Sequence, residues 1–194
     1  EYSPDLVLLA FFPGNDIINN SKKLEFYKRR PFFIYQNGEL IPDQSWLKMS
    51  PAEHDYLQFS SVDYLPTWLV NKSRILRLVR QVDLNNKKSR VDATEKKRFP
   101  NNFQEPINPV WKEAWQVTEG LITLMSQEVK AKNADFMVLI VSMGAQVHPD
   151  PIGRQSYMKQ FGIKDLYYPN QRIKALGDRL NITTLDTVPR LREY

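Results

Sequence analysis

The stretch that decides the fold is "PDLVLLAFF" at residues 4–12, which is followed at once by the tetrapeptide "PGND" at 13–16. A nearly continuous apolar run of this length, with turn residues on both sides, is typical of a strand buried on both faces of a parallel sheet. Two further runs, "ADFMVLIVSM" (134–143) and the shorter "NITTLDTV" (181–188), predict strands of the same sheet.

Helices are predicted between these strands. The segment 108–133 carries apolar residues at helical spacing, with Asn108 placed to cap its start and Pro109 suited to its first turn. Shorter helices are predicted over 169–180 and 188–194. Alternation of strand and helix predicts a three-layer α/β/α fold with a parallel sheet and right-handed crossovers, as in flavodoxin-like proteins.

Residues 17–107 do not follow this alternation, and we interpret them as a large, mainly helical insertion or lid-like subdomain within a single α/β domain spanning 1–194. Asn37-Gly38 is a strong hairpin turn signal. The expected elements of the insertion are a β-hairpin near 31–42, helices over 50–59 (which contains His54) and 63–84, and a flexible polar loop near 85–106.

The composition excludes several kinds of site. The chain of 194 residues has no cysteine and two histidines, which excludes disulfides, zinc–thiolate centres, cysteine nucleophiles and histidine-rich metal sites. No glycine-rich phosphate-binding motif follows any predicted strand, so we expect no nucleotide cofactor. Because the chain has two histidines and no H-E-x-x-H motif, we also expect no metal. The net charge of +5 is concentrated in 22–30 and 87–98, where acids are interspersed, and we interpret both runs as solvated surface.

Ligands bind to open parallel sheets at the carboxyl ends of the strands. After the first predicted strand, Gly14 allows a sharp turn and Asn15 presents an amide that could donate hydrogen bonds to an oxyanion. The alternative is that Asn15 or Asp16 only caps the next segment. After the second strand come Ser142 and His148, which could form a nucleophilic pair, although Ser142 lacks a G-x-S-x-G elbow.

The stretch "PDLVLLAFFPGNDIINNS" resembles the third conserved block of the SGNH (GDSL-like) hydrolases, in which a buried strand ends in a G-x-N-D motif. Pro13 stands where the first glycine of that motif is usual. The order of elements over 108–194 is also similar to that family. The resemblance implies serine ester hydrolysis or acyl transfer, with Asn15 as an oxyanion donor, and Gly14, Asp16, Ser142 and His148 as pocket or loop support.

The other blocks of that family are absent from this sequence. The single Gly-Asp pair, at 177–178, is followed by Arg179 in place of serine, and no D-x-x-H occurs. The resemblance therefore implies an internal piece of a hydrolase, incomplete at both ends and inactive alone.

Two alternatives remain open. One is a non-catalytic α/β binding module whose basic insertion contacts an anionic polymer or a membrane surface. The other is an enzyme of a different α/β family that uses Ser142 and His148. For the hydrolase interpretation we expect a small ester or acylated carbohydrate as substrate, no cofactor and no nucleic acid. Membrane contact and oligomeric state stay open. Localisation is equally open, since any targeting segment would lie before Glu1 and a secreted, periplasmic or membrane-anchored protein fits.

Overall fold

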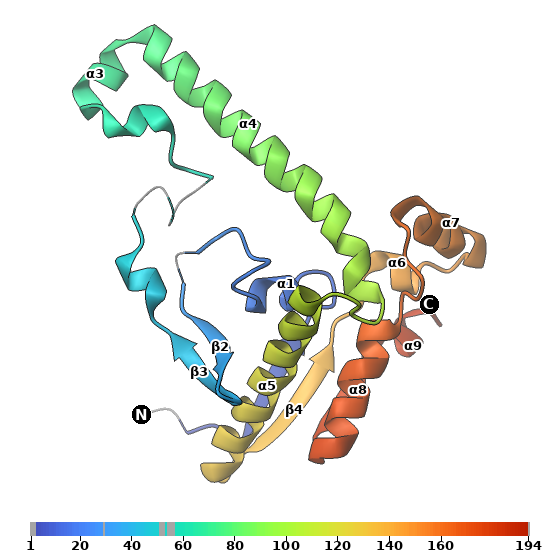
Figure 1. The fold of residues 1–194 in the computed structure, drawn as a ribbon. Helices are drawn as coiled ribbons and strands as arrows, with labels where there is room; N and C mark the ends of the chain where they lie inside the picture. Colours follow the sequence, from blue (N-terminus) through green and yellow to red (C-terminus); the bar gives the residue numbers. More distant parts are fainter. Residues whose placement is uncertain (1–2, 29, 51–52, 54–56, 194) are drawn as a thin grey trace.

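The computed structural model describes residues 3–28, 30–50, 53 and 57–193 and shows a mixed α/β fold built on a parallel sheet (Figure 1). The sheet has the strand order β1-β4-β5, with β1 at Leu6–Phe11, β4 at Asp135–Ile140 and β5 at Thr183–Asp186. Both pairings are parallel. The three strands predicted from apolar runs are therefore confirmed, each slightly shorter than its run.

Two helices cover one face of this sheet: α5, at Pro109–Ala131, and α8, at Tyr168–Leu180 (Figure 1). The Asn108 side chain caps α5 by accepting from Trp111 N at 3.0 Å, as the sequence predicts. Apolar side chains at helical spacing on α5 and α8 meet alternate side chains of the strands. The resulting core contains Trp111, Ala114, Trp115, Ile122, Phe136, Val138, Ile140, Ile173 and Leu176.

The opposite face of the sheet is much more open. Along β1, Val7, Leu9 and Phe11 face the core, whereas Leu6 and Leu8 are 49% and 51% exposed. Leu185 of β5, on the same open face, is 46% exposed. The α/β class with a parallel sheet is thus observed, and in the described part of the chain the helices α5 and α8 form a layer on one face only.

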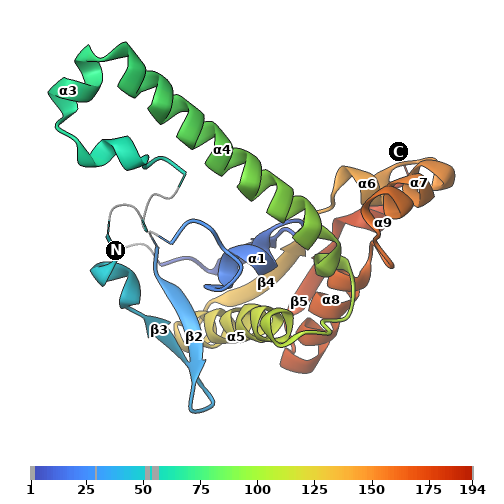
Figure 2. The same ribbon diagram turned by 45° about the horizontal axis from the view of Figure 1, so that its top comes forward.

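The segment between β1 and α5 begins with α1 (Asp16–Asn20) and the predicted hairpin, formed by β2 (Phe32–Gln36) and β3 (Glu39–Asp43). Asn37 and Gly38 connect the two strands with φ values of 53° and 85°, the left-handed conformations that a two-residue hairpin turn requires. The hairpin lies beside α5 (Figure 2). The short helices η1 (Ser45–Lys48) and η2 (Ser61–Tyr64) follow it. Of the helix predicted over 50–59, residues 51–52 and 54–56, which include His54, lie outside the described residues, and residues 57–59 are not helical.

The structure corrects the prediction for the following residues. The helix expected over 63–84 is divided into η2, α3 (Thr67–Lys72) and α4 (Arg74–Arg98), and the flexible loop expected near 85–106 is wrong, because α4 continues to Arg98. Ser73 caps α4 by accepting from Leu76 N, and no proline or glycine interrupts residues 74–99. Lysine and most other polar residues there are compatible with a helix, so their polarity was not sufficient evidence for a loop.

Helix α4 and the elements at its start project away from the sheet as an arm (Figures 1 and 2). At its base α4 leads directly into η3 (Phe99–Phe103), which packs against the domain through the buried Phe103. None of the helices in the described residues is long and apolar enough to cross a membrane.

Candidate active site

The carboxyl ends of the three parallel strands meet at one edge of the sheet, as expected. Val141 N donates to Phe11 O at 2.8 Å and so continues the sheet past the end of β4. Thr187, the first residue of α9 (Thr187–Leu191), joins the other two strand ends: its hydroxyl donates to Ile140 O at 3.0 Å and accepts from Ser142 N at 2.9 Å. The loops that follow β1, β4 and β5 are therefore fixed to one another by hydrogen bonds.

The tetrapeptide after β1 forms a tight loop closed by Asp16. One carboxylate oxygen of Asp16 accepts from Phe12 N at 2.7 Å, and Asp16 N donates to Phe12 O at 3.2 Å. Burial raises the pKa of the Asp16 carboxyl above its ordinary value, and the hydrogen bond from Phe12 partly opposes the shift. A Cβ at Gly14 would lie 2.5 Å from the Phe12 ring, so a larger residue at position 14 would require this ring to move.

A further contact to this loop comes from η3, at the base of the arm. Asn102, in η3, is fully buried and donates from Nδ2 to Gly14 O at 2.8 Å. Its Oδ1 is buried and has no hydrogen-bond partner in the described residues. Sequence reasoning missed Asn102 because it lies in the stretch interpreted as a flexible loop, 88 positions from Gly14.

Asn15 itself occupies the N-cap position of α1, but its side chain makes no capping hydrogen bond. Its backbone carbonyl accepts from Asn19 N at 2.8 Å, and the residue is exposed. The turn chemistry of the tetrapeptide is thus supplied by Asp16 and Gly14. The Asn15 amide has no partner recorded among the described residues, which leaves its N–H groups available to a ligand.

Ser142 and His148 lie on the neighbouring loop but do not form a pair. Their side chains share no hydrogen bond in the described structure; Ser142 is held through its backbone by Thr187. His148 precedes α7 (Pro151–Phe161), and its Nδ1 accepts from Asp150 N at 3.2 Å. The ring packs closely against Gly153, where an added Cβ would lie 2.7 Å from Cε1. This geometry gives His148 a place in the turn before α7 and no contact with Ser142.

A buried polar network beneath the strand ends was also missed from the sequence. Gln146, in α6 (Gly144–Val147), is fully buried and accepts from Met143 N at 2.8 Å. Its Nε2 donates to Leu166 O at 2.7 Å and to Asn170 Oδ1 at 2.8 Å. Asn170 in turn donates to Asp186 Oδ1 at 2.9 Å. The network joins α6, α8 and the end of β5, so it fixes the loops that follow β4 and β5.

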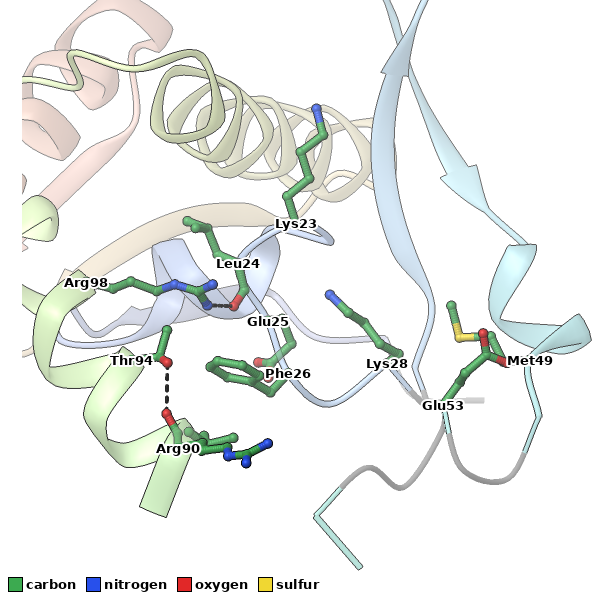
Figure 3. Close-up of a pocket in the computed structure, with 11 residues that line it drawn as sticks. Lys23, Leu24, Glu25, Phe26, Lys28, Met49, Glu53, Arg90, Thr94 and Arg98 are labelled. Carbon is green, nitrogen blue, oxygen red and sulfur yellow. Dashed lines mark hydrogen bonds between the residues drawn. The ribbon is translucent and has the colours of Figure 1, made fainter. Parts of the chain in front are cut away.

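A separate pocket of about 670 Å³ lies between the base of α4 and residues 23–28 (Figure 3). Its cations are largely committed: Lys23 pairs with Glu113, Lys28 donates to Lys22 O, and Arg98 donates to Leu24 O at 2.6 Å. The Arg98 guanidinium also lies 4.8 Å from the centre of the Phe26 ring. The contacts of Arg98 with Leu24 and Phe26 place this pocket where the arm meets the domain. Because most of its cations already have partners, we do not interpret it as an anion site.

Within the described ranges no group of three or more His, Cys, Asp or Glu side chains could hold a metal ion. Comparisons with protein-family models, with curated proteins and with solved structures found no match. The fold and the strand ends therefore define only a class of protein. It is an α/β protein with an open parallel sheet and, at the carboxyl edge of that sheet, a polar loop held by hydrogen bonds.

Proposed function

We propose that this chain is part of an SGNH-like serine esterase or acyl hydrolase in which Asn15 donates a hydrogen bond to the oxyanion. The observation that carries the proposal is the Asn15 side chain, exposed and without a recorded partner on a loop that Asp16, Gly14 and Asn102 brace. A donor stabilises a developing oxyanion best when it is fixed before the reaction, because no reorganisation is then needed in the transition state.

The nucleophile and the general base lie outside this chain in the proposal. Ser142 and His148 do not contact each other through a hydrogen bond, and the Nδ1 of His148 is engaged by Asp150 N. We assign these two residues to loop support, with Gly14 and Asp16. The substrate is a small ester or an acylated carbohydrate, and the catalysis uses no metal or cofactor: a serine attacks the acyl carbonyl, a histidine carries the proton, and Asn15 stabilises the tetrahedral oxyanion.

The sheet itself supports the presence of further strands in the complete fold. β1 is an edge strand in the described sheet, and a groove of about 900 Å³ lined by Val7, Leu9 and Phe33 runs along it. Leu6 and Leu8 are half exposed on the other side of the strand. We propose that a strand bearing the nucleophile pairs with this edge and that a further helical layer covers the open face, giving the flavodoxin-like three-layer arrangement. An unpaired apolar edge is otherwise prone to aggregate.

The test uses the reading frame that contains this chain. We expect it to encode a G-D-S upstream of Glu1 and a D-x-x-H downstream of Tyr194; an open reading frame that starts at Glu1 and stops after Tyr194 would overturn the proposal. In the protein so defined, Asn15→Ala and the isosteric Asn15→Asp should each lower kcat on a p-nitrophenyl ester by about 10²–10³-fold, since both remove the donor.

The matched control is Asn85→Ala, on the exposed surface of α4. It removes the same amide without touching the strand ends, so kcat should stay unchanged. Circular dichroism of all variants should match the parent, because the Asn15 side chain supports no recorded structural contact. Full activity in both Asn15 variants would reduce Asn15 to a turn residue.

A further inference from the structure

The tip of the arm exposes large apolar side chains that nothing in the described structure covers. On α4, Ile75, Leu78, Val79 and Val82 are 74%, 62%, 47% and 51% exposed. They follow the spacing i, i+3, i+4, i+7, so they share one face of the first two turns of the helix. Beyond Val82 the same face continues with Asn86 and Ser89, so the apolar surface is confined to the end of α4 farthest from the sheet.

The elements that pack on the start of α4 also expose large apolar side chains. α3 and η2 both pack on α4, and Trp68 of α3 is 64% exposed, with Leu69 beside it at 36%. Tyr64, at the end of η2, is 74% exposed. We define the arm tip as residues 64–82. Several large apolar side chains are exposed within this short segment, whereas on an ordinary surface such residues are scattered singly.

The charge of the arm tip has one sign. Residues 64–82 contain Lys72, Arg74, Arg77 and Arg80 and no aspartate or glutamate. Arg80 pairs with Asp63 at 2.7 Å. Lys72, Arg74 and Arg77 are exposed, and no acidic partner is recorded for them in the described ranges. Three exposed cations therefore share the arm tip with the exposed apolar side chains, and this tip lies at the end of a projecting helix (Figures 1 and 2).

We propose that the arm tip docks on the surface of an anionic lipid bilayer. An aromatic and aliphatic face flanked by lysine and arginine is the combination that binds the boundary between headgroups and acyl chains. The cations contact lipid phosphates while Trp68, Ile75 and Leu78 enter the interface. A nucleic acid would leave those apolar groups in water. A protein partner would have to supply acidic and apolar groups together to match them. This binding is independent of the proposed ester hydrolysis.

The arrangement of the arm makes such docking geometrically simple. The tip is at the free end of a 25-residue helix that spans roughly 37 Å at 1.5 Å per residue. The base of that helix is fixed to the domain by Arg98 and Phe103. The strand ends therefore stand away from the membrane surface when the tip is bound, and the domain is tethered without any helix crossing the bilayer.

The experiment is co-sedimentation of the full chain with sucrose-loaded vesicles of phosphatidylcholine alone or with one quarter phosphatidylglycerol. We expect binding to the anionic vesicles that weakens as salt is raised. A triple variant, K72Q/R74Q/R77Q, should lower the partition coefficient by roughly 100-fold, at about five-fold for each cation near the surface. The variant W68S/I75S/L78S should lower it by at least about 100-fold.

The charge-matched control is K88Q/K96Q/K97Q, which removes three exposed cations nearer the base of the same helix and should change binding by less than about five-fold. Equal loss in this control would show a diffuse charge effect and overturn the assignment to the tip. No binding of the parent chain to anionic vesicles would also overturn it. So would self-association of the parent, measured by sedimentation velocity, that W68S/I75S/L78S abolishes while vesicle binding persists, because the apolar face would then serve a second copy.

Discussion

Gly177 tests whether the spacing between α8 and β5 is set by the absence of a side chain. An added Cβ at this position would overlap the Thr184 Cγ2 methyl and lie 3.0 Å from Ile182 O. The second contact is with backbone, which cannot rotate away, and Ile182 N itself donates to Gly177 O at 2.9 Å. We therefore expect Gly177→Ala to shift α8 and the chain around Ile182 apart by a few tenths of an ångström and to displace the Thr184 methyl.

Two effects of opposite sign decide the size of the change. Alanine in a helix interior is favoured over glycine by about 1 kcal/mol. Overpacking a closely packed site destabilises by about 1–3 kcal/mol, and here a backbone oxygen is one of the obstacles, which places the effect in the upper part of that range. We expect Gly177→Ala to lower the free energy of unfolding by about 1–2 kcal/mol, and the melting temperature by roughly 2–8 °C for a chain of this size.

Urea denaturation followed by circular dichroism measures the change. Thr184→Ala removes the overlapping methyl, so the double variant should recover part of the loss, with a coupling energy of about 1 kcal/mol. Gly144→Ala is the control, because no atom lies within 4 Å of the added Cβ there, and it should alter stability by less than about 0.5 kcal/mol. Wild-type stability of Gly177→Ala, or no coupling to Thr184, would refute the packing argument.

Two further predictions concern the polar groups at the strand ends. Gln146→Leu should destabilise the protein by about 3–5 kcal/mol, because it leaves Met143 N and two buried acceptors without a partner. The control Gln127→Leu, at an exposed position of α5, should stay within about 0.5 kcal/mol of wild type in the same urea titration. A similar loss of stability in both variants would show that the network is dispensable. For Asp16, burial raises the folded-state pKa above its ordinary value of 3.8, so the folded state binds this proton more tightly than the unfolded state and stability falls as pH rises from 3.8 through the raised pKa. Asp16→Asn has no such proton, and the stability of wild type relative to this variant should therefore decrease over that interval and be level on either side of it; a difference that is constant with pH would contradict the role of burial.

Local patterns sufficed to predict the sheet and the helices that cover it. The apolar runs at 4–12 and 134–143 are short and bounded by turn residues, which is typical of strands buried in a sheet. Asn108 and Pro109 mark the start of α5. The hairpin followed from Asn37-Gly38, because few other pairs of residues adopt two successive left-handed conformations. These elements depend on residues close together in the chain, which is why sequence reasoning reached them.

The arm and the bracing of the Asn15 loop could not be reached in that way. Residues 85–98 were interpreted as a loop because they are polar, yet an arm that projects into solvent needs no apolar face along most of its length. Asn102 and Gln146 acquire their meaning from Gly14 and Asn170, which lie 88 and 24 positions away. Position 15 was indicated by its place after a strand, but the reason its amide is free lies in contacts made by Asp16 and Asn102.

Those contacts also change how the segment 17–107 should be regarded. An insertion that merely decorates a domain could be deleted without disturbing the sheet edge. Here α4 runs directly into η3, and η3 carries the Asn102 amide that donates to Gly14 O, while Phe103 is fully buried in the domain. Removing the segment would leave the Gly14 carbonyl without this donor and would open the cluster around Phe103. The base of the arm is therefore part of the structure that supports the Asn15 loop. Only the outer part of the arm, which precedes Arg98 in the chain, is free to serve a separate role.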